Sequence, residues 1–160
     1  SVETLQSTVH RAVAGNRPIS VAGGRYAMGG QQFCSDGILL DARSLNRALS
    51  FDRERGLIEV ESGIQWPALI ELLEHLQSGS ERPWSIAQKQ TGADRLTIGG
   101  AVAANAHGRG LLMQPFVSDV EALKLVDVST YNRYLTFFPA SWRYFDDCLG
   151  MVTRWGLVKP

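Results

Sequence analysis

The sequence has few cysteines, no excess of charge of either sign and no long apolar run. Its two cysteines, Cys34 and Cys148, lie far apart without the CxxC or His-bearing spacing of a zinc site. Sixteen basic side chains balance sixteen acidic ones, which argues against a nucleic-acid partner. Apolar runs fall far short of the roughly 20 residues of a membrane span. With no signal-peptide pattern at the N-terminus, we expect a soluble cytoplasmic protein with reduced thiols, no metal site and no membrane span.

Two common nucleotide-binding fingerprints are also missing. No three glycines satisfy G-x-G-x-x-G, which excludes a Rossmann dinucleotide site. The stretch from Gly24 to Gly29 is not followed by the Lys-Ser/Thr pair of a P-loop. A nucleotide site in this chain would therefore use another architecture.

The hydrophobic content of 44% is enough for a real core in a chain of 160 residues. Apolar spacing predicts helices, and short apolar runs bounded by turn residues predict strands. We expect helices at 2–14, 66–76 and 98–106, and strands at 18–22, 37–41, 48–51, 57–61 and 119–128. We expect the strands at 48–51 and 57–61 to form a hairpin around the charged turn 52–56.

These elements predict an α+β protein with two lobes. The stretch from Gln77 to Trp84 is polar and rich in helix-breaking residues, so we place the boundary there. The first lobe would span 1–84 and carry the first of two glycine-rich loops. The second lobe would span 85–160.

The first glycine-rich loop has the sequence AGGRYAMGGQ, residues 22–31, directly after a buried strand. Because glycine has no Cβ, the backbone N–H groups of such a loop can converge on an anion. This favours a diphosphate-bearing ligand. From the glycines alone, a wide turn between two strands is an equally good interpretation.

The second glycine-rich loop is TGADRLTIGGAVAANAHGRG, residues 91–110. Gly99 and Gly100 would let the start of a short helix present free N–H groups to phosphate. Tight helix packing through glycine and alanine is the alternative. His107 alone does not indicate catalysis, because a single histidine before a glycine is more often structural.

In this order and spacing, the two loops resemble the FAD-binding (PCMH-type) domain of the vanillyl-alcohol oxidase and p-cresol methylhydroxylase flavoproteins. The resemblance covers residues 1–128 and 149–153, and is nearest to the sugar, lactone and alditol oxidase branch, including decaprenylphosphoryl-ribose oxidases. It implies a two-lobed domain, with a small parallel or mixed sheet in one lobe and an antiparallel sheet with flanking helices in the other. It also implies FAD as the cofactor.

The resemblance places cofactor-binding residues in three segments. The first loop would wrap the diphosphate with main-chain N–H groups, the second would follow the ribityl chain and flavin, and a late G-x-V segment would lie near the adenine half. The residues carried over are Gly23, Gly24, Arg25, Tyr26, Ala27, Met28 and Gly29; Gly92, Ala93, Thr97, Gly100, Ala104, Asn105, His107 and Gly108; and Gly150, Met151 and Val152.

The sequence departs from the family at two places. Many members bond the flavin covalently through a histidine where this chain has Tyr26, so we expect non-covalent FAD. Residues 129–144 are aromatic and free of glycine, and Asp146, Asp147 and Cys148 occupy positions where the family has glycines. We expect a solvated turn at the two acidic residues; hydrogen bonds to ribose hydroxyls and repulsion of the diphosphate are the alternatives.

The resemblance implies an oxidoreductase that transfers hydride to FAD from a hydroxyl-bearing carbon of a sugar, lactone or polyol. Family members carry the catalytic base and much of the pocket in a C-terminal substrate domain, and this chain ends at Pro160 before one begins. We therefore expect a cofactor-binding module that is incomplete for turnover. Two alternatives stay open: a non-catalytic FAD or nucleotide carrier, and an interaction module that uses the aromatic segment 131–145.

Overall fold

The computed structural model describes residues 1–90, 92–108, 112, 114–127, 133–136 and 148–158. Its helices are α1 (Val2–Ala14), α2 (Trp66–Leu76) and α3 (Ile98–Ala103), with short 3-10 turns η1 (Ala42–Ser44) and η2 (Phe116–Asp119). Its strands are β1 (Ile19–Ala22), β2 (Ile38–Asp41), β3 (Ala48–Asp52), β4 (Leu57–Glu61), β5 (Ser85–Ile86), β6 (Val120–Asp127), β7 (Arg133–Thr136) and β8 (Cys148–Val158). Within these residues, no helix is long and apolar enough to cross a membrane.

The strands form two sheets, as the α+β prediction requires. β1 and β2 pair in parallel, with Ile19 opposite Ile38 and Ala22 opposite Asp41. The larger sheet has the order β3-β4-β8-β6-β7, and all of its pairs are antiparallel. β5 pairs with the end of β8. The predicted fold class, with one parallel and one antiparallel sheet, is confirmed.

The larger sheet takes strands from both sides of residue 84. β3 and β4 precede that residue, and β4 pairs along its whole length with β8, which follows it. Hydrogen bonding thus joins the two predicted lobes, and their division at residue 84 stays a prediction.

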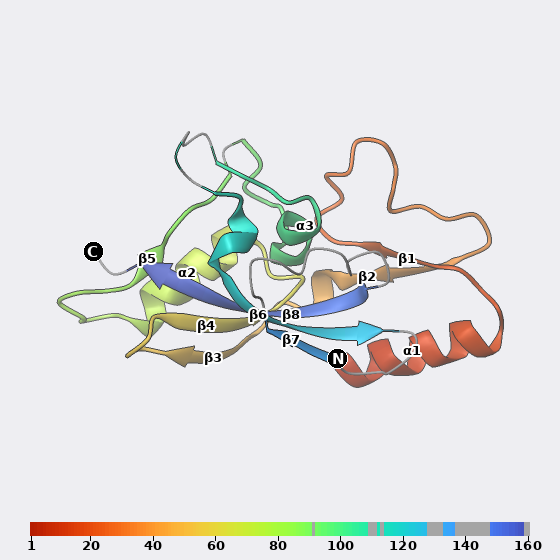
Figure 1. Ribbon diagram of the computed structural model, residues 1–160, viewed down its shortest axis with the longest axis horizontal. Helices are drawn as coiled ribbons and strands as arrows, with labels where there is room; N and C mark the ends of the chain where they lie inside the picture. Colours follow the sequence, from red (N-terminus) through yellow and green to blue (C-terminus); the bar gives the residue numbers. More distant parts are fainter. Residues whose placement is uncertain (91, 109–111, 113, 128–132, 137–147, 159–160) are drawn as a thin grey trace.

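The main core lies between the larger sheet and the helices α2 and α3, which Figure 1 shows above the sheet. Trp66 opens α2 and meets Phe116 of η2 edge to face, with ring centroids 5.3 Å apart. Ile58 of β4, Ile98 of α3 and Leu123 of β6 are also completely buried in this cluster. Because the cluster joins these segments, it fixes where α3 begins.

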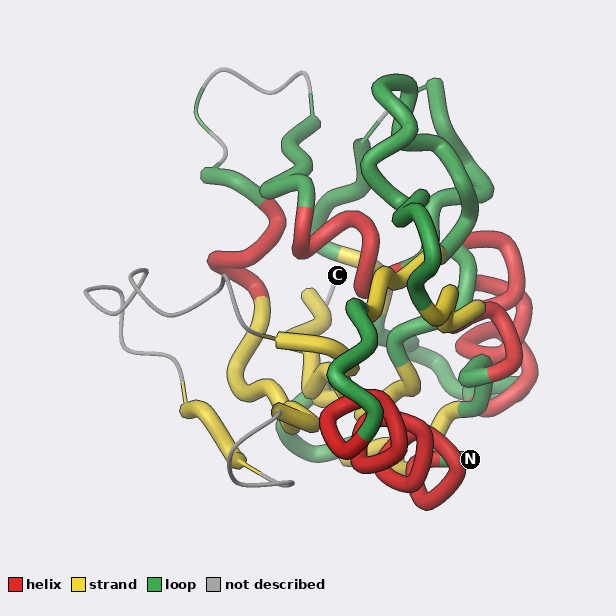
Figure 2. Tube along the Cα trace, turned by 90° about the vertical axis from the view of Figure 1, so that its right-hand side faces the viewer, coloured by secondary structure: helices red, strands yellow, loops and turns green. Residues whose placement is uncertain are grey.

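A smaller core lies under α1. Leu5 and Val9 on the buried face of α1 pack with Leu45 and with Val126 of β6. Ser1 caps this helix by accepting a hydrogen bond from the Thr4 amide, and Asn16, with φ +47°, ends the turn that follows it. Figure 2 shows α1 on one side of the molecule and the long loops gathered on the other.

Four elements, α3, β5, β7 and β8, differ from the sequence-based expectation. α3 is shorter than predicted: it ends at Ala103, and Asn105 has a left-handed backbone with φ +46°. The strands β5, β7 and β8 were not predicted: β5 has only two residues, β7 lies within the aromatic segment 129–144, and β8 pairs with β4, which lies far away in the sequence. Most of the aromatic segment 131–145, with Asp146 and Asp147, lies outside the described residues.

Candidate functional site

The two glycine-rich loops lie against each other. A Cβ atom placed on Gly23 would lie 2.3 Å from Oγ1 of Thr97, and one placed on Gly24 would lie 2.4 Å from the carbonyl oxygen of Arg95. No side chain fits at such distances, so glycine is required at both positions. Residues separated by more than 70 positions are thereby brought to one place, as the resemblance implies.

A cavity of about 280 Å³ opens where the two loops meet. It lies among α1, the ends of β1 and β2, η1 and the start of α3. Its volume is at the small end of ligand pockets, which hold roughly 300–1,000 Å³, so it suits one part of a dinucleotide. The lining residues are Ser1, Thr4, Leu5, Thr8, Val21, Gly23, Leu40, Asp41, Ala42, Ser44, Leu45, Ser62, Thr97, Gly99, Gly100 and Ala103.

The first loop offers backbone donors. In the described part of the chain, the amides of Gly24 to Gly29 have no acceptor. The loop closes through bonds from the Gly30 amide to the Ala27 carbonyl and from the Phe33 amide to the Gly30 carbonyl. Arg25 has a left-handed backbone with φ +61°, a conformation that lets successive N–H groups converge. This geometry suits an anion with several oxygen atoms.

The second loop does not offer the free amides that the sequence indicated. The Ile98 amide donates to the Ile64 carbonyl at 2.9 Å, and the Gly99 amide donates to the Ser62 carbonyl at 2.8 Å. The Gly100 amide donates to the Thr97 hydroxyl, which caps α3. The prediction of free N–H groups at Gly99 and Gly100 was therefore wrong, because the Ser62 carbonyl, in the turn after β4, and the Thr97 hydroxyl already accept from them.

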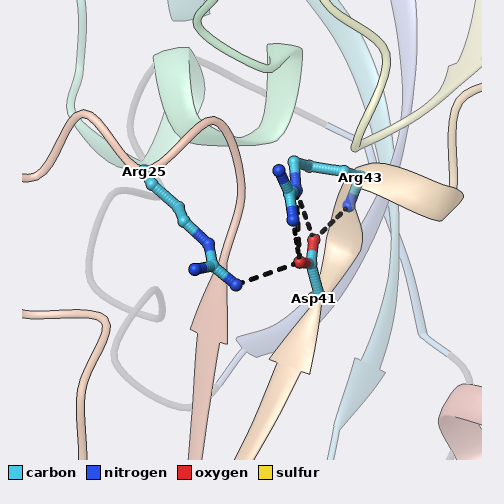
Figure 3. A network of polar contacts seen from close by, with 3 residues as sticks. All are labelled: Arg25, Asp41 and Arg43. Atoms are coloured by element: carbon cyan, nitrogen blue, oxygen red, sulfur yellow. Dashed lines mark hydrogen bonds and ion pairs between the residues drawn. The ribbon is translucent and has the colours of Figure 1, made fainter.

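Asp41 connects the cavity to the first loop. It ends β2, lines the cavity and accepts hydrogen bonds from Arg43 and from Arg25 (Figure 3). The hydrogen bonds from Arg43, opposed by partial burial and helped by Arg25, hold the pKa of this carboxyl well below its usual range. Asp41 is thus charged at neutral pH.

The remaining predicted residues of the first loop lie at the surface. Tyr26 is about half exposed, and its ring lies beside Gly24. Met28 is completely exposed, and Ala27 and Gly29 are exposed as well. None of these four lines the cavity. Their assignment to cofactor binding stays a prediction.

In the second loop, Thr97 and Gly100 line the cavity and the other predicted residues do not. Gly92 has a φ of +87°, and the carbonyl of Ala93 accepts from Nε2 of Gln90 at 3.0 Å. At the far end of α3, Nδ1 of the exposed His107 lies 3.0 Å from the carbonyl oxygen of Gly108. Ala104 and Asn105 are exposed beside it.

The late G-x-V segment lies in the middle of the larger sheet. Its strand β8 runs between β4 and β6, and the backbone of Val152 pairs with Glu61 on one side and Lys124 on the other. Met151 pairs with Leu125. The predicted role of Gly150, Met151 and Val152 near adenine stays a prediction.

Sequence reasoning missed several residues of the cavity. Asp41 and Ser62 belong to it although neither lies in a glycine-rich loop. A polar residue at the carboxyl end of an apolar strand is a signal for Asp41, since parallel strands bring such ends together. Thr4 and Thr8 come from α1, and no local signal marks them.

The comparisons with known proteins agree with this geometry. The family model for the FAD binding domain matches residues 1–130. The L-gulono-1,4-lactone dehydrogenase of Mycobacterium tuberculosis is 33% identical over 93 residues, covering 58% of this chain and 20% of that protein. The L-gulonolactone oxidase of Mus musculus is 25% identical over 126 residues, covering 79% of this chain and 27% of that protein. The chain thus spans about a fifth to a quarter of these relatives.

Solved structures show the same fold. An alkyldihydroxyacetonephosphate synthase superposes with a TM-score of 0.76 over 97% of this chain and 28% of its own, at 17% sequence identity. A second crystal form of such a synthase gives a TM-score of 0.73 at 19% identity.

The residues of the site fit the group that this family binds. The first loop has unpaired backbone donors, and side chains are excluded at Gly23 and Gly24 where the loops meet. Both features suit the diphosphate of FAD. The chain therefore belongs to the FAD-binding-domain family of flavoproteins.

Proposed function

We propose that this chain binds FAD without a covalent bond and forms the cofactor half of an oxidoreductase. The diphosphate would lie on the amides of Gly24 to Gly29, beside the cavity. The ribityl chain and flavin would follow the second loop from Gly92 to Gly108. The late segment from Gly150 to Val152 would lie toward the adenine half.

The difference between the two loops carries this proposal. The amides at the start of α3 are already bonded, whereas those of Gly24 to Gly29 have no acceptor in the described residues. An anion therefore gains most at the first loop, since its oxygens would meet donors that lack partners. The second loop can then pack closely against the cofactor without donating hydrogen bonds from these amides.

Tyr26 supports a non-covalent site. It stands where related flavoproteins have the histidine that bonds to the flavin, and a phenol does not supply an imidazole nitrogen. Its ring is about half exposed beside Gly24. Tyr26 can therefore contribute an aromatic surface at this position.

We infer that the substrate is a lactone, sugar or polyol with a hydroxyl-bearing carbon. The bound flavin supplies the hydride acceptor in such a reaction. The names of the M. tuberculosis dehydrogenase and the mouse oxidase support a lactone or a closely related compound. The described residues orient the cofactor, and none of them is assigned as the base that removes the hydroxyl proton.

A second candidate function is that of an FAD carrier without catalysis. It is favoured by the exposed position of His107, which lies at the end of the second loop and contacts the carbonyl of its own neighbour. A general base is normally held within hydrogen-bond reach of its substrate by surrounding groups. No such arrangement surrounds His107 in the described residues.

Reconstitution with FAD tests both candidates. The purified chain is mixed with FAD, freed of excess cofactor and examined by absorption spectroscopy, and flavin bands in the protein fraction are expected. After acid precipitation, the yellow colour should stay in the supernatant. A coloured pellet would contradict the non-covalent site, and a chain that ignores FAD would contradict the proposed function. Anaerobic bleaching by L-gulono-1,4-lactone would favour the oxidoreductase over the carrier, whereas unbleached flavin is expected for either candidate in a module that is incomplete for turnover.

A further inference from the structure

The cluster of Arg25, Asp41 and Arg43 contains more positive than negative charge. Arg43 Nε donates to both carboxylate oxygens of Asp41, at 2.9 and 3.1 Å, and Arg43 Nη2 donates to Oδ2 at 2.5 Å. Arg25 adds one longer bond, from Nη2 to Oδ2 at 3.2 Å. Because two guanidinium groups share a single carboxylate, one positive charge is left without a counterion in the cluster.

Arg25 is the more weakly held of the two arginines. Its side chain is 44% exposed, and the bond to Asp41 is its only side-chain hydrogen bond in the described part of the chain. Exposed ion pairs of this kind contribute little to stability. Arg25 can therefore leave Asp41 at small cost, and Asp41 would keep all of its bonds to Arg43.

The position of Arg25 places it beside the proposed diphosphate site. Its own backbone amide is one of the donors of the first loop that lack an acceptor. Figure 3 shows its side chain crossing from that loop to the end of β2, where Asp41 lines the cavity. An anion on the loop amides would thus lie within the length of one arginine side chain. Guanidinium binds phosphate with two parallel hydrogen bonds.

We propose that Arg25 exchanges partners when the cofactor binds: its guanidinium leaves Asp41 and pairs with the diphosphate, while Arg43 continues to neutralise Asp41. This inference rests on the proposed FAD site. It adds one side chain to a loop that was proposed to bind the diphosphate through its backbone amides alone. Asp41 then pairs with Arg25 in the absence of the cofactor and competes with the diphosphate for it.

Four single variants and the wild-type chain test the exchange by titration with FAD. Arg25→Gln removes the positive charge, and Arg25→Lys keeps the charge but cannot form bidentate hydrogen bonds to a phosphate. Asp41→Asn removes the competing carboxylate but keeps an oxygen that can accept from the Arg43 amide. Arg55→Gln is the matched control, because Arg55 is also an exposed arginine paired with one carboxylate, that of Glu121, at 3.0 Å. Thermal unfolding of each variant checks that it is folded.

We expect Arg25→Gln to weaken FAD binding by about tenfold to a hundredfold, the loss typical of one charge-assisted hydrogen-bonded pair. Arg25→Lys should lose less, and Arg55→Gln should bind as the wild type does. Asp41→Asn should bind FAD as tightly as the wild type or more tightly. Added salt should weaken the wild type more steeply than Arg25→Gln, since one ionic contact is missing from the variant.

Two results would overturn the exchange while leaving the FAD site intact. One is wild-type affinity in Arg25→Gln. The other is an equal loss of affinity in Arg25→Gln and Asp41→Asn, because that pattern would mean that the ion pair only shapes the loop. If the wild-type chain itself ignores FAD, the proposed function fails first, and the exchange fails with it.

Discussion

Gly23 and Thr97 are in such close contact that a methyl group on Gly23 would lie 2.3 Å from the Thr97 hydroxyl oxygen. Thr97 is buried, and the same hydroxyl caps α3 by accepting from the Gly100 amide at 3.1 Å. The Thr97 side chain therefore takes part both in the contact between the two loops and in the start of α3.

The first prediction concerns this pair. Gly23→Ala should destabilise the protein by about 1–3 kcal/mol, the usual cost of overpacking. Thr97→Ala should cost about 1 kcal/mol through loss of the cap. In the double variant the new methyl group occupies the space of the lost hydroxyl, so its cost should be smaller than the two single costs combined. Urea denaturation of all four proteins measures this, and strict additivity would show that the two residues do not meet.

The second prediction concerns the buried carboxylate of Glu61. Its side chain is 2% exposed, and Arg47 holds it through the backbone amide, Nε and Nη2. Arg47→Met should destabilise the protein by roughly 2–4 kcal/mol, because a buried charge loses its partner. Arg55→Met, which breaks the exposed pair with Glu121, should cost at most about 1 kcal/mol. Equal costs in thermal denaturation would contradict the burial of Glu61.

The same pair predicts sensitivity to acid. The side-chain hydrogen bond from Arg47 lowers the pKa of Glu61 from its ordinary value of about 4.5. The unfolded chain therefore binds a proton at higher pH than the folded one. The stabilisation is present above pH 4.5 and is lost as the pH falls through the lower, folded pKa. Unfolding midpoints measured below pH 5 should decline less steeply for Arg47→Met than for the wild type.

Asp119 predicts the opposite dependence on pH. Burial raises the pKa of its carboxyl, and the hydrogen bond from Gln88 Nε2 opposes that rise only in part. The folded protein keeps this proton to higher pH than the unfolded chain does, so stability falls as the pH rises from the unfolded pKa to the folded one. Asp119→Asn keeps an acceptor for Gln88 and should be at least as stable as the wild type at pH 7. A clear loss of stability in this variant would refute the interpretation.

Two glycines with similar backbones but different surroundings provide a further prediction. Gly56 has φ +65° and Gly79 has φ +81°, so alanine is strained at both. A Cβ on Gly79 would meet nothing within 4 Å, whereas one on Gly56 would lie 2.5 Å from the ring of Trp84. Gly79→Ala should cost about 1–2 kcal/mol, and Gly56→Ala should cost about 1–3 kcal/mol more. Similar unfolding midpoints for the two variants would contradict the packing of Trp84 on the turn.

The sequence predicted the elements whose periodicity is local. The spacing of Leu5, Val9 and Ala12 indicated α1, and the charged turn 52–56 indicated the hairpin of β3 and β4, with boundaries close to the observed ones. It did not predict β8, because a strand between two partners distant in the sequence leaves no short-range pattern that distinguishes it from a loop.

The glycine-rich loops indicated where the candidate site lies. The prediction of which backbone amides are free to bind an anion was wrong for the second loop. The close approach of another segment to Gly23 requires a residue without a Cβ atom, so a glycine at that position could indicate it from the sequence. The use of the Ile98 and Gly99 amides depends on the Ile64 and Ser62 carbonyls, which only the folded chain brings near. The same reason explains why Asp41 was predicted to end a strand but not to join the site.

The central position of β8 has a consequence for how the protein is made. β4 and β6 each form a long ladder with β8 and do not pair with each other. During synthesis from the N-terminus, both strands therefore keep one unpaired edge until residues 148–158 have emerged from the ribosome. Unpaired edges invite association between chains. Nascent or prematurely terminated chains that stop before residue 148 should thus depend on chaperones far more than chains that include β8.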